Sequence, residues 1–158
     1  MKNLREILDK TVEWIGVILL AIMVLTVLWQ VFTRTVLNNP NTITEEFVRF
    51  SLVWLSLLAS AYVVGKQAHL NVSLLSDTLS GKNKFKLEIV IQVLFLLFSL
   101  IVMIFGGLKG VSITMGQISP SLGLPMGYVY LAVPVSGVIM LVYSVMNLID
   151  RIKEEKGL

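Results

Sequence analysis

The fold is decided by an uncharged apolar segment close to the N-terminus, in which residues 14–33 read WIGVILLAIMVLTVLWQVFT. At a rise of about 1.5 Å per residue, these 20 residues form a helix about 30 Å long, which matches the hydrocarbon core of a bilayer. Further uncharged runs occupy residues 50–65, 89–108 and 110–149. Pro120 and Pro125 divide the last run. The sequence therefore predicts four membrane-spanning helices, at about 12–36, 43–65, 86–110 and 126–149.

Composition supports an integral membrane protein and leaves little material outside the bilayer. Of the 158 residues, 56% are hydrophobic and 15% are charged, with a mean hydropathy of +0.84, whereas soluble domains carry about 25% charged residues. The longest polar connection, residues 66–88, is far shorter than the roughly 50 residues of the smallest domains. We therefore expect an all-α integral membrane protein in which residues 1–158 form a single four-helix membrane domain.

Residue types that carry out redox and metal chemistry are scarce. The chain has no cysteine and a single histidine, His69. This excludes disulfides, thiol catalysis, iron–sulfur clusters bound by thiolates, bis-histidine haem and histidine-based zinc sites. The apolar runs also contain no acidic residue, which an intrinsic proton relay would need. We expect no catalytic residue, no cofactor, no metal and no enzymatic activity.

The distribution of basic residues predicts the orientation. With four spans, the N-terminal segment, the second connection and the C-terminal segment share one side, and they hold ten of the 13 basic residues. The positive-inside rule then places both termini in the cytoplasm. The same asymmetry accounts for the net charge of +3 without a nucleic-acid partner. Because the first apolar run is longer than the roughly 7–15 residues of a signal peptide, we expect a retained helix.

The second connection has an amphipathic pattern over residues 68–80, where apolar residues recur at helical spacing and polar residues fill the opposite face. We expect a short helix lying in the cytoplasmic interface. Four residues are assigned to that interface: His69, Lys82, Lys84 and Lys86. For His69, one interpretation is a pH-responsive contact, and the interpretation we favour is a cap or a neighbour of lipid headgroups.

The connection between the first two spans carries signals for a turn and a helix start. Residues 38–41, Asn-Asn-Pro-Asn, predict a turn. Thr42 and Glu45 then fit a capping box at the start of the second helix. Pro134 lies inside the fourth span and predicts a kink there, because it lacks the backbone N–H and its ring clashes with the preceding turn.

The candidate functional site consists of four charged residues near the periplasmic ends of the first two helices: Arg34, Glu45, Glu46 and Arg49. Glu45 and Arg49 are four residues apart, a spacing that suits an ion pair on a helix. One interpretation is a polar platform that binds a periplasmic or membrane partner. The other is a network that holds the first hairpin together, and the spacing alone favours it.

The sequence resembles the small membrane subunit of tripartite ATP-independent periplasmic (TRAP) transporters, of the DctQ type. The resemblance rests on the first hairpin, on the motif after the second span and on the start of the fourth span. The matching elements are WQVFTR at 29–34, the Asn39-Pro40 turn, Thr44-Glu45-Glu46 with Arg49 and Trp54, HLNV at 69–72, and PMGYVY at 125–130 with Pro134.

The resemblance implies a sodium-driven importer in the bacterial inner membrane. In this type of transporter, a periplasmic substrate-binding protein delivers an organic acid to a two-part membrane complex, whose large subunit holds the sodium and substrate sites. The small subunit would act as a fixed scaffold, so its expected partners are the large membrane subunit, the binding protein and the lipid bilayer. The implied solutes are C4-dicarboxylates or sialic acid, of which we favour sialic acid. The four charged residues would face the large subunit or the binding protein.

Two other classes of function remain open. Four short helices suffice for a self-assembling small exporter or channel, which would need an essential carboxylate such as Glu13, Glu45 or Glu46. A membrane enzyme is disfavoured by the single histidine, the lack of cysteine and the lack of clustered acids within the spans.

Overall fold

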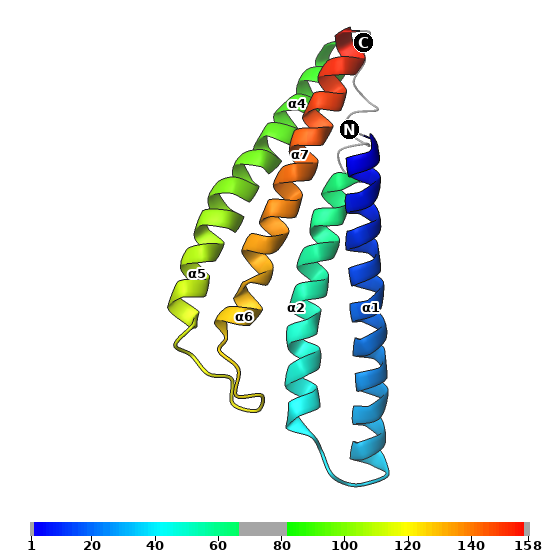
Figure 1. The fold of residues 1–158 in the computed structure, drawn as a ribbon, viewed down its shortest axis with the longest axis vertical. Helices are drawn as coiled ribbons and strands as arrows, with labels where there is room; N and C mark the ends of the chain where they lie inside the picture. Colours follow the sequence, from blue (N-terminus) through cyan, green and yellow to red (C-terminus); the bar gives the residue numbers. More distant parts are fainter. Residues whose placement is uncertain (1, 67–81, 157–158) are drawn as a thin grey trace.

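A computed structural model describes residues 2–66 and 82–156, and within them the chain is helical with no β-strand. Four stretches are long and apolar enough to cross a membrane: Asn3–Thr35, Thr42–Gly65, Lys86–Thr114 and Gly127–Lys153. The predicted all-α architecture with four spans is therefore confirmed. Both termini lie at one end of the bundle, which we call the terminal end (Figure 1). The opposite end, with the connections 36–41 and 115–126, is the loop end.

The first hairpin consists of α1 (Lys2–Thr35) and α2 (Thr42–Gly65). Asn41 caps α2, because its side-chain oxygen accepts a hydrogen bond of 3.0 Å from the N–H of Ile43. The predicted capping box is therefore wrong, because the cap is Asn41 rather than Thr42 and the Glu45 carboxylate pairs with Arg49. The extended backbone of Asn41 (φ −102°, ψ 106°) directs its carboxamide at the free N–H groups of the first turn, so Thr42 is already helical.

The second hairpin begins with one long continuous helix, made of α4 (Lys82–Leu97), the π-helical segment η1 (Phe98–Gly106) and α5 (Gly107–Thr114). The wider π winding occupies the middle of the span. The sequence does not reveal it, because a continuous apolar run is compatible with either winding. The helix also continues past the predicted end of this span, at residue 110, as far as Thr114.

The chain returns through α6 (Gly127–Tyr130) and α7 (Ala132–Lys156), which are separated by an interruption at Leu131. Pro134 lies in the first turn of α7. Its ring would clash with the carbonyl four residues earlier, that of Tyr130, which is where the helix breaks. The predicted kink therefore takes the form of a short break before the proline.

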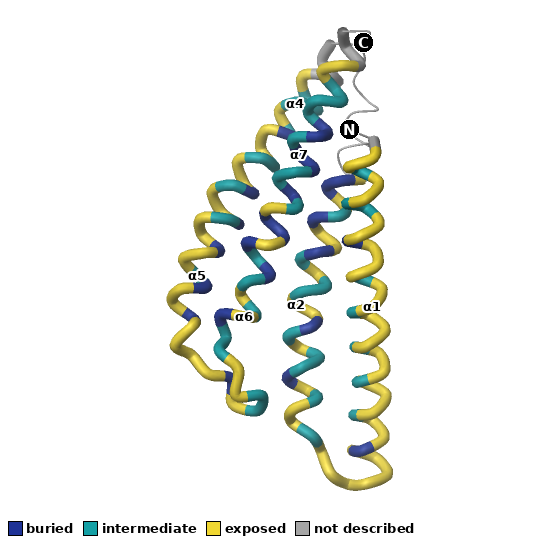
Figure 2. The backbone as a smooth tube through the Cα atoms, viewed as in Figure 1, coloured by how far each residue is buried: buried dark blue, intermediate teal, exposed yellow. Residues whose placement is uncertain are grey.

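α7 lies in the centre of the bundle and packs against α2, α4 and η1, whereas α1 lies at the edge and packs along α2. Figure 2 shows buried positions gathered on α7 and an almost fully exposed α1. The contact between α7 and η1 is close, because a Cβ atom on Gly137 would lie only 2.6 Å from the Cβ of Met103. Ala61, Val64 and Met140 complete a small buried cluster with Met103, which joins α2, η1 and α7.

Candidate functional site

The four charged residues predicted as one site do not form a single network among the residues that the structure describes. Glu45 Oε1 and Arg49 Nη2 are 3.1 Å apart on α2, and both side chains are more than half exposed. Arg34 is exposed in the last turn of α1, and no described residue forms an ion pair with it. Glu46 is buried, with 7% of its surface exposed, and contacts a different part of the chain.

Glu46 joins α2 to the connection between α5 and α6. Its Oε2 accepts hydrogen bonds from the backbone N–H groups of Ser121 at 2.9 Å and Leu122 at 2.8 Å, and from the hydroxyl of Ser119 at 3.3 Å. Hydrogen bonds to an ionised carboxylate are about twice as strong as neutral ones. Gly123, with φ +65°, closes the turn by donating its N–H to the Ser119 carbonyl at 3.1 Å. We call the contacts of Glu46 with Ser119, Ser121 and Leu122 the loop tie.

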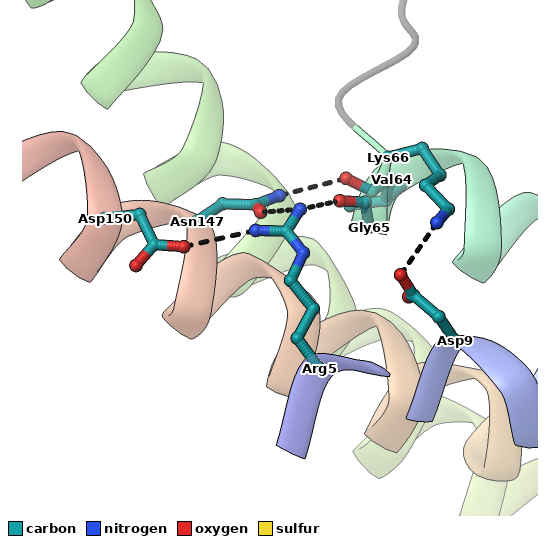
Figure 3. Close-up of polar contacts among 7 residues, drawn as sticks. All are labelled: Arg5, Asp9, Val64, Gly65, Lys66, Asn147 and Asp150. Atoms are coloured by element: carbon teal, nitrogen blue, oxygen red, sulfur yellow. Dashed lines mark hydrogen bonds and ion pairs between the residues drawn. The ribbon is translucent and has the colours of Figure 1, made fainter. Parts of the chain in front are cut away.

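A second polar cluster joins α1, α2 and α7 near the terminal end (Figure 3). The guanidinium of Arg5 donates to Asp150 Oδ2 at 3.1 Å, to Asn147 Oδ1 at 3.0 Å, and to the carbonyl of Gly65. Asn147 is fully buried and donates its side-chain N–H to the Val64 carbonyl at 3.0 Å. The last carbonyls of a helix lack an intrahelical partner. Arg5 and Asn147 supply partners for two of them at the end of α2.

Asp9 makes a further contact between α1 and the other helices. Its Oδ2 lies 2.7 Å from Lys66 Nζ, and its Oδ1 accepts a hydrogen bond of 2.7 Å from the hydroxyl of Tyr143. The hydrogen bond to Asp9 raises the pKa of the Lys66 ammonium above its usual value. The ring of Tyr143 occupies the space beside Gly65, where a Cβ atom would lie 2.5 Å from it. We call the contacts of Arg5, Asp9, Lys66, Tyr143, Asn147 and Asp150 the terminal tie.

Sequence reasoning missed the terminal tie. Arg5 and Lys66 are two of the ten basic residues that predicted the orientation, and no other role was assigned to them. Asp9, Tyr143 and Asn147 were not singled out. One signal was available, because Asn147 is a carboxamide in an otherwise apolar part of the fourth span. Lipid offers such a group no hydrogen-bond partner, so it must face other helices.

The residues assigned to the interface after the second span are only partly described. Lys86 is exposed near the start of α4, and the backbones of Lys82 and Lys84 belong to the same helix. His69 and the helix expected at 68–80 lie outside the described residues. In the described part of the chain, no three histidine, aspartate or glutamate side chains gather closely enough to hold a metal ion.

One side of α2, away from the rest of the bundle, is exposed along its length. We call it the outer face of α2, and it comprises Glu45, Arg49, Leu52, Ser56 and Ser60. The hydroxyls of Ser56 and Ser60 donate to carbonyls within the same helix, at 3.0 and 2.8 Å, so they need no outside partner. Small side chains of this kind allow a neighbouring helix to approach closely in a membrane.

The family of the chain follows from comparison with known proteins. Residues 23–154 match the family described as tripartite ATP-independent periplasmic transporters, DctQ component. The chain belongs to the DctQ family. The resemblance seen in the sequence is thus confirmed. The matched residues include the end of α1, all of α2, nearly all of the second hairpin and the whole loop tie, whereas Arg5 and Asp9 of the terminal tie precede the match. DctQ proteins are membrane subunits of TRAP transporters, so the polar ties and the outer face of α2 are features of a transporter component.

Individual relatives agree with the DctQ assignment. The sialic acid TRAP transporter small permease protein SiaQ of Vibrio cholerae is 30% identical over 93 residues, which cover 59% of this chain and 54% of SiaQ. The chain therefore spans about half the length of that relative. Two proteins of Haemophilus influenzae, each named putative TRAP transporter small permease protein, are 25% identical over 152 residues. These matches cover 96% of this chain and 94% and 92% of the relatives.

Proposed function

We propose that this DctQ chain is the stationary scaffold subunit of a sodium-driven TRAP importer and binds neither solute nor ion itself. The observation that carries the proposal is the pair of polar ties, which hold the two hairpins together at both ends of the bundle. Lipid tails are as apolar as the side chains of membrane helices, so hydrophobic burial contributes little to helix association within a bilayer. Directional polar contacts fix the arrangement of the helices instead. A subunit against which another subunit moves needs such a fixed arrangement.

The proposed partners are the large membrane subunit and a periplasmic substrate-binding protein, in a bacterial inner membrane. Family membership supports both partners. The proposed solute is an organic acid, and the similarity to the sialic acid transporter subunit of Vibrio cholerae supports sialic acid rather than a C4-dicarboxylate.

Reconstitution into liposomes tests the proposal. The purified chain with the binding protein and an inward sodium gradient should take up neither sialic acid nor succinate, and adding the large subunit should start uptake of one of them. Replacing the sodium gradient by a potassium gradient should stop it. Uptake by the chain without the large subunit would contradict the scaffold role and favour an exporter or channel.

We propose that the terminal end faces the cytoplasm, since ten of the 13 basic residues belong to the segments that share it. The absence of cysteine from the chain allows a clean labelling test. A membrane-impermeant maleimide should label Gln117→Cys, at the loop end, in intact spheroplasts. It should label Lys153→Cys only after permeabilisation. The unmodified chain is the control for background, and the reverse pattern would overturn the proposed orientation.

We propose that the large subunit packs against the outer face of α2, extended toward the loop end by Arg34. Ser56→Phe should remove most of the large subunit from a pull-down of the complex, because a bulky ring would hold the partner helix away from a surface of small side chains. Leu25→Phe is the control, since Leu25 is 67% exposed on the far edge helix α1. Equal recovery of the partner with both variants would place the interface elsewhere.

A further inference from the structure

An apolar groove of about 410 Å³ opens between the two hairpins. Phe47, Trp54 and Leu58 on α2 form its floor. One wall comes from α1, and the other comes from α7, α6 and the α5–α6 connection. Phe47 and Leu58 are 11 residues apart, so the floor is about 16 Å long at the rise of an α-helix. This side of α2 is opposite to its outer face, because the floor residues and Ser56 differ by about half a turn of the helix.

The groove is open along its side, and packed residues bound it at its two ends. At the loop end, Leu122 and Leu124 close it, and the loop tie holds Leu122 in place through its N–H. Toward the terminal end, α2 and α7 come into direct contact, and Ala61 and Tyr143 are fully buried between helices. The space is therefore a short, side-opening slot in a part of the molecule that the hydrocarbon of the bilayer surrounds.

The dimensions decide between possible occupants. A membrane-spanning helix is about 30 Å long and 10–12 Å wide, so it is too large for a groove with a floor of about 16 Å and a volume of about 410 Å³. A stable protein interface engages roughly 20–30 residues on each side, whereas 13 residues line this groove. The same comparison excludes a second copy of the chain as the occupant of the groove. Water is also a poor occupant, because only three of the lining side chains, those of Ser51, Trp54 and Tyr128, carry a polar atom.

We propose that the groove binds one acyl chain of a phospholipid from the leaflet at the loop end. A flexible hydrocarbon chain is narrow enough for the slot. It makes dispersion contacts with the walls, which would lack partner atoms if the groove were empty. Tyr128 lies at the loop end of the groove with 54% of its surface exposed, which is where an aromatic side chain meets lipid headgroups. Because the two ties fix both hairpins, the groove is preformed and holds its lipid more firmly than the rest of the membrane-facing surface does.

Retention of lipid by the purified full-length chain tests the proposal. After extensive detergent washing, native mass spectrometry should find about one phospholipid per chain. Ser51→Phe and Val135→Phe fill the groove from the floor and from the α7 wall, and both should lose that phospholipid. Ser112→Phe makes the same substitution as Ser51→Phe on an exposed turn of α5 outside the groove, and it should keep the lipid. Two filling variants on different helices guard against misfolding of one of them.

Fluorescence supplies a second readout, because Trp54 lies in the groove while Trp14 and Trp29 are exposed on α1. The chain is loaded with phospholipid brominated on its acyl chains and then diluted into detergent. Quenching should persist in a variant that retains only Trp54 and disappear in one that retains only Trp14. The proposal is overturned if the washed wild-type chain carries no phospholipid, if the filling variants keep it, or if both tryptophans recover together. It is also overturned if the complex with the large subunit loses the lipid that the isolated chain retains.

Discussion

Arg5→Ala is expected to destabilise the chain by about 2–6 kcal/mol, since the substitution leaves two buried acceptors without a donor, at about 1–3 kcal/mol each. These acceptors are the Asn147 Oδ1 and the Gly65 carbonyl. The lost ion pair with Asp150 adds little, because the Asp150 side chain is 41% exposed and water screens it. The measurement is the unfolding midpoint of the purified chain in detergent, together with solute uptake by the complex.

Two variants separate the role of the hydrogen bonds from that of the charge. Lys10→Ala removes one positive charge from an exposed position on the same helix and should leave the midpoint almost unchanged. Arg5→Lys keeps the charge, but an ammonium cannot match the planar fork that reaches three acceptors, so its midpoint should lie between those of wild type and Arg5→Ala. If Lys10→Ala and Arg5→Ala are equally stable, the terminal tie does not hold α1 in place.

Glu46→Ala is expected to release the α5–α6 connection and to lower uptake by the complex at least about tenfold, which corresponds to about 1.4 kcal/mol. The carboxylate is the acceptor for the N–H groups of Ser121 and Leu122, and an unpaired buried donor costs about 1–3 kcal/mol. The connection should therefore open until water reaches these groups. Hydrogen exchange of the two amides should become much faster, and this can be measured on the chain alone.

The neighbouring residue provides a matched control for Glu46. Glu45→Ala removes the same side chain one position earlier, where it forms only an exposed ion pair worth about 0–1 kcal/mol. It should leave the exchange of the connection unchanged. Glu46→Gln keeps an acceptor oxygen but loses the charge, so its exchange rates should be intermediate. Unchanged exchange in Glu46→Ala would show that the loop tie does not order the connection. Faster exchange with full uptake would show that an ordered connection is not needed for the scaffold role.

The charged residues illustrate how far the sequence alone could lead. The spacing of Glu45 and Arg49 correctly predicted an ion pair, because residues four apart on a helix face one another. The same pattern did not predict that the adjacent Glu46 binds the α5–α6 connection, which is more than 70 residues away in the sequence. Helical periodicity assigns a residue to a face, but it does not say which segment of the chain will lie against that face.

The cap of α2 and the break before α7 also divide into what the sequence predicted and what only the structure decided. The sequence placed the first turn and the start of α2 within one residue, and only the backbone angles decided that Asn41 rather than Thr42 caps the helix. Pro134 predicted a disturbance in the fourth span, and the structure shows it as a break at Leu131. Local chemistry therefore predicted that these features exist, while their position depended on the conformation of the neighbouring residues.

By itself, the sequence determined the number of spans, the helical class and the resemblance to the DctQ family. It did so because bilayer thickness converts the length of an apolar run directly into a helix, whatever lies beside it. Only the tertiary structure decided that Arg5 binds the end of α2, that Glu46 orders the α5–α6 connection, and that an apolar groove lies between the hairpins. The contacts of Arg5 with Gly65 and of Glu46 with Leu122 join residues 60 and 76 positions apart, and the groove is lined from five segments of the chain. Such contacts arise from helix packing and are not encoded in any local pattern.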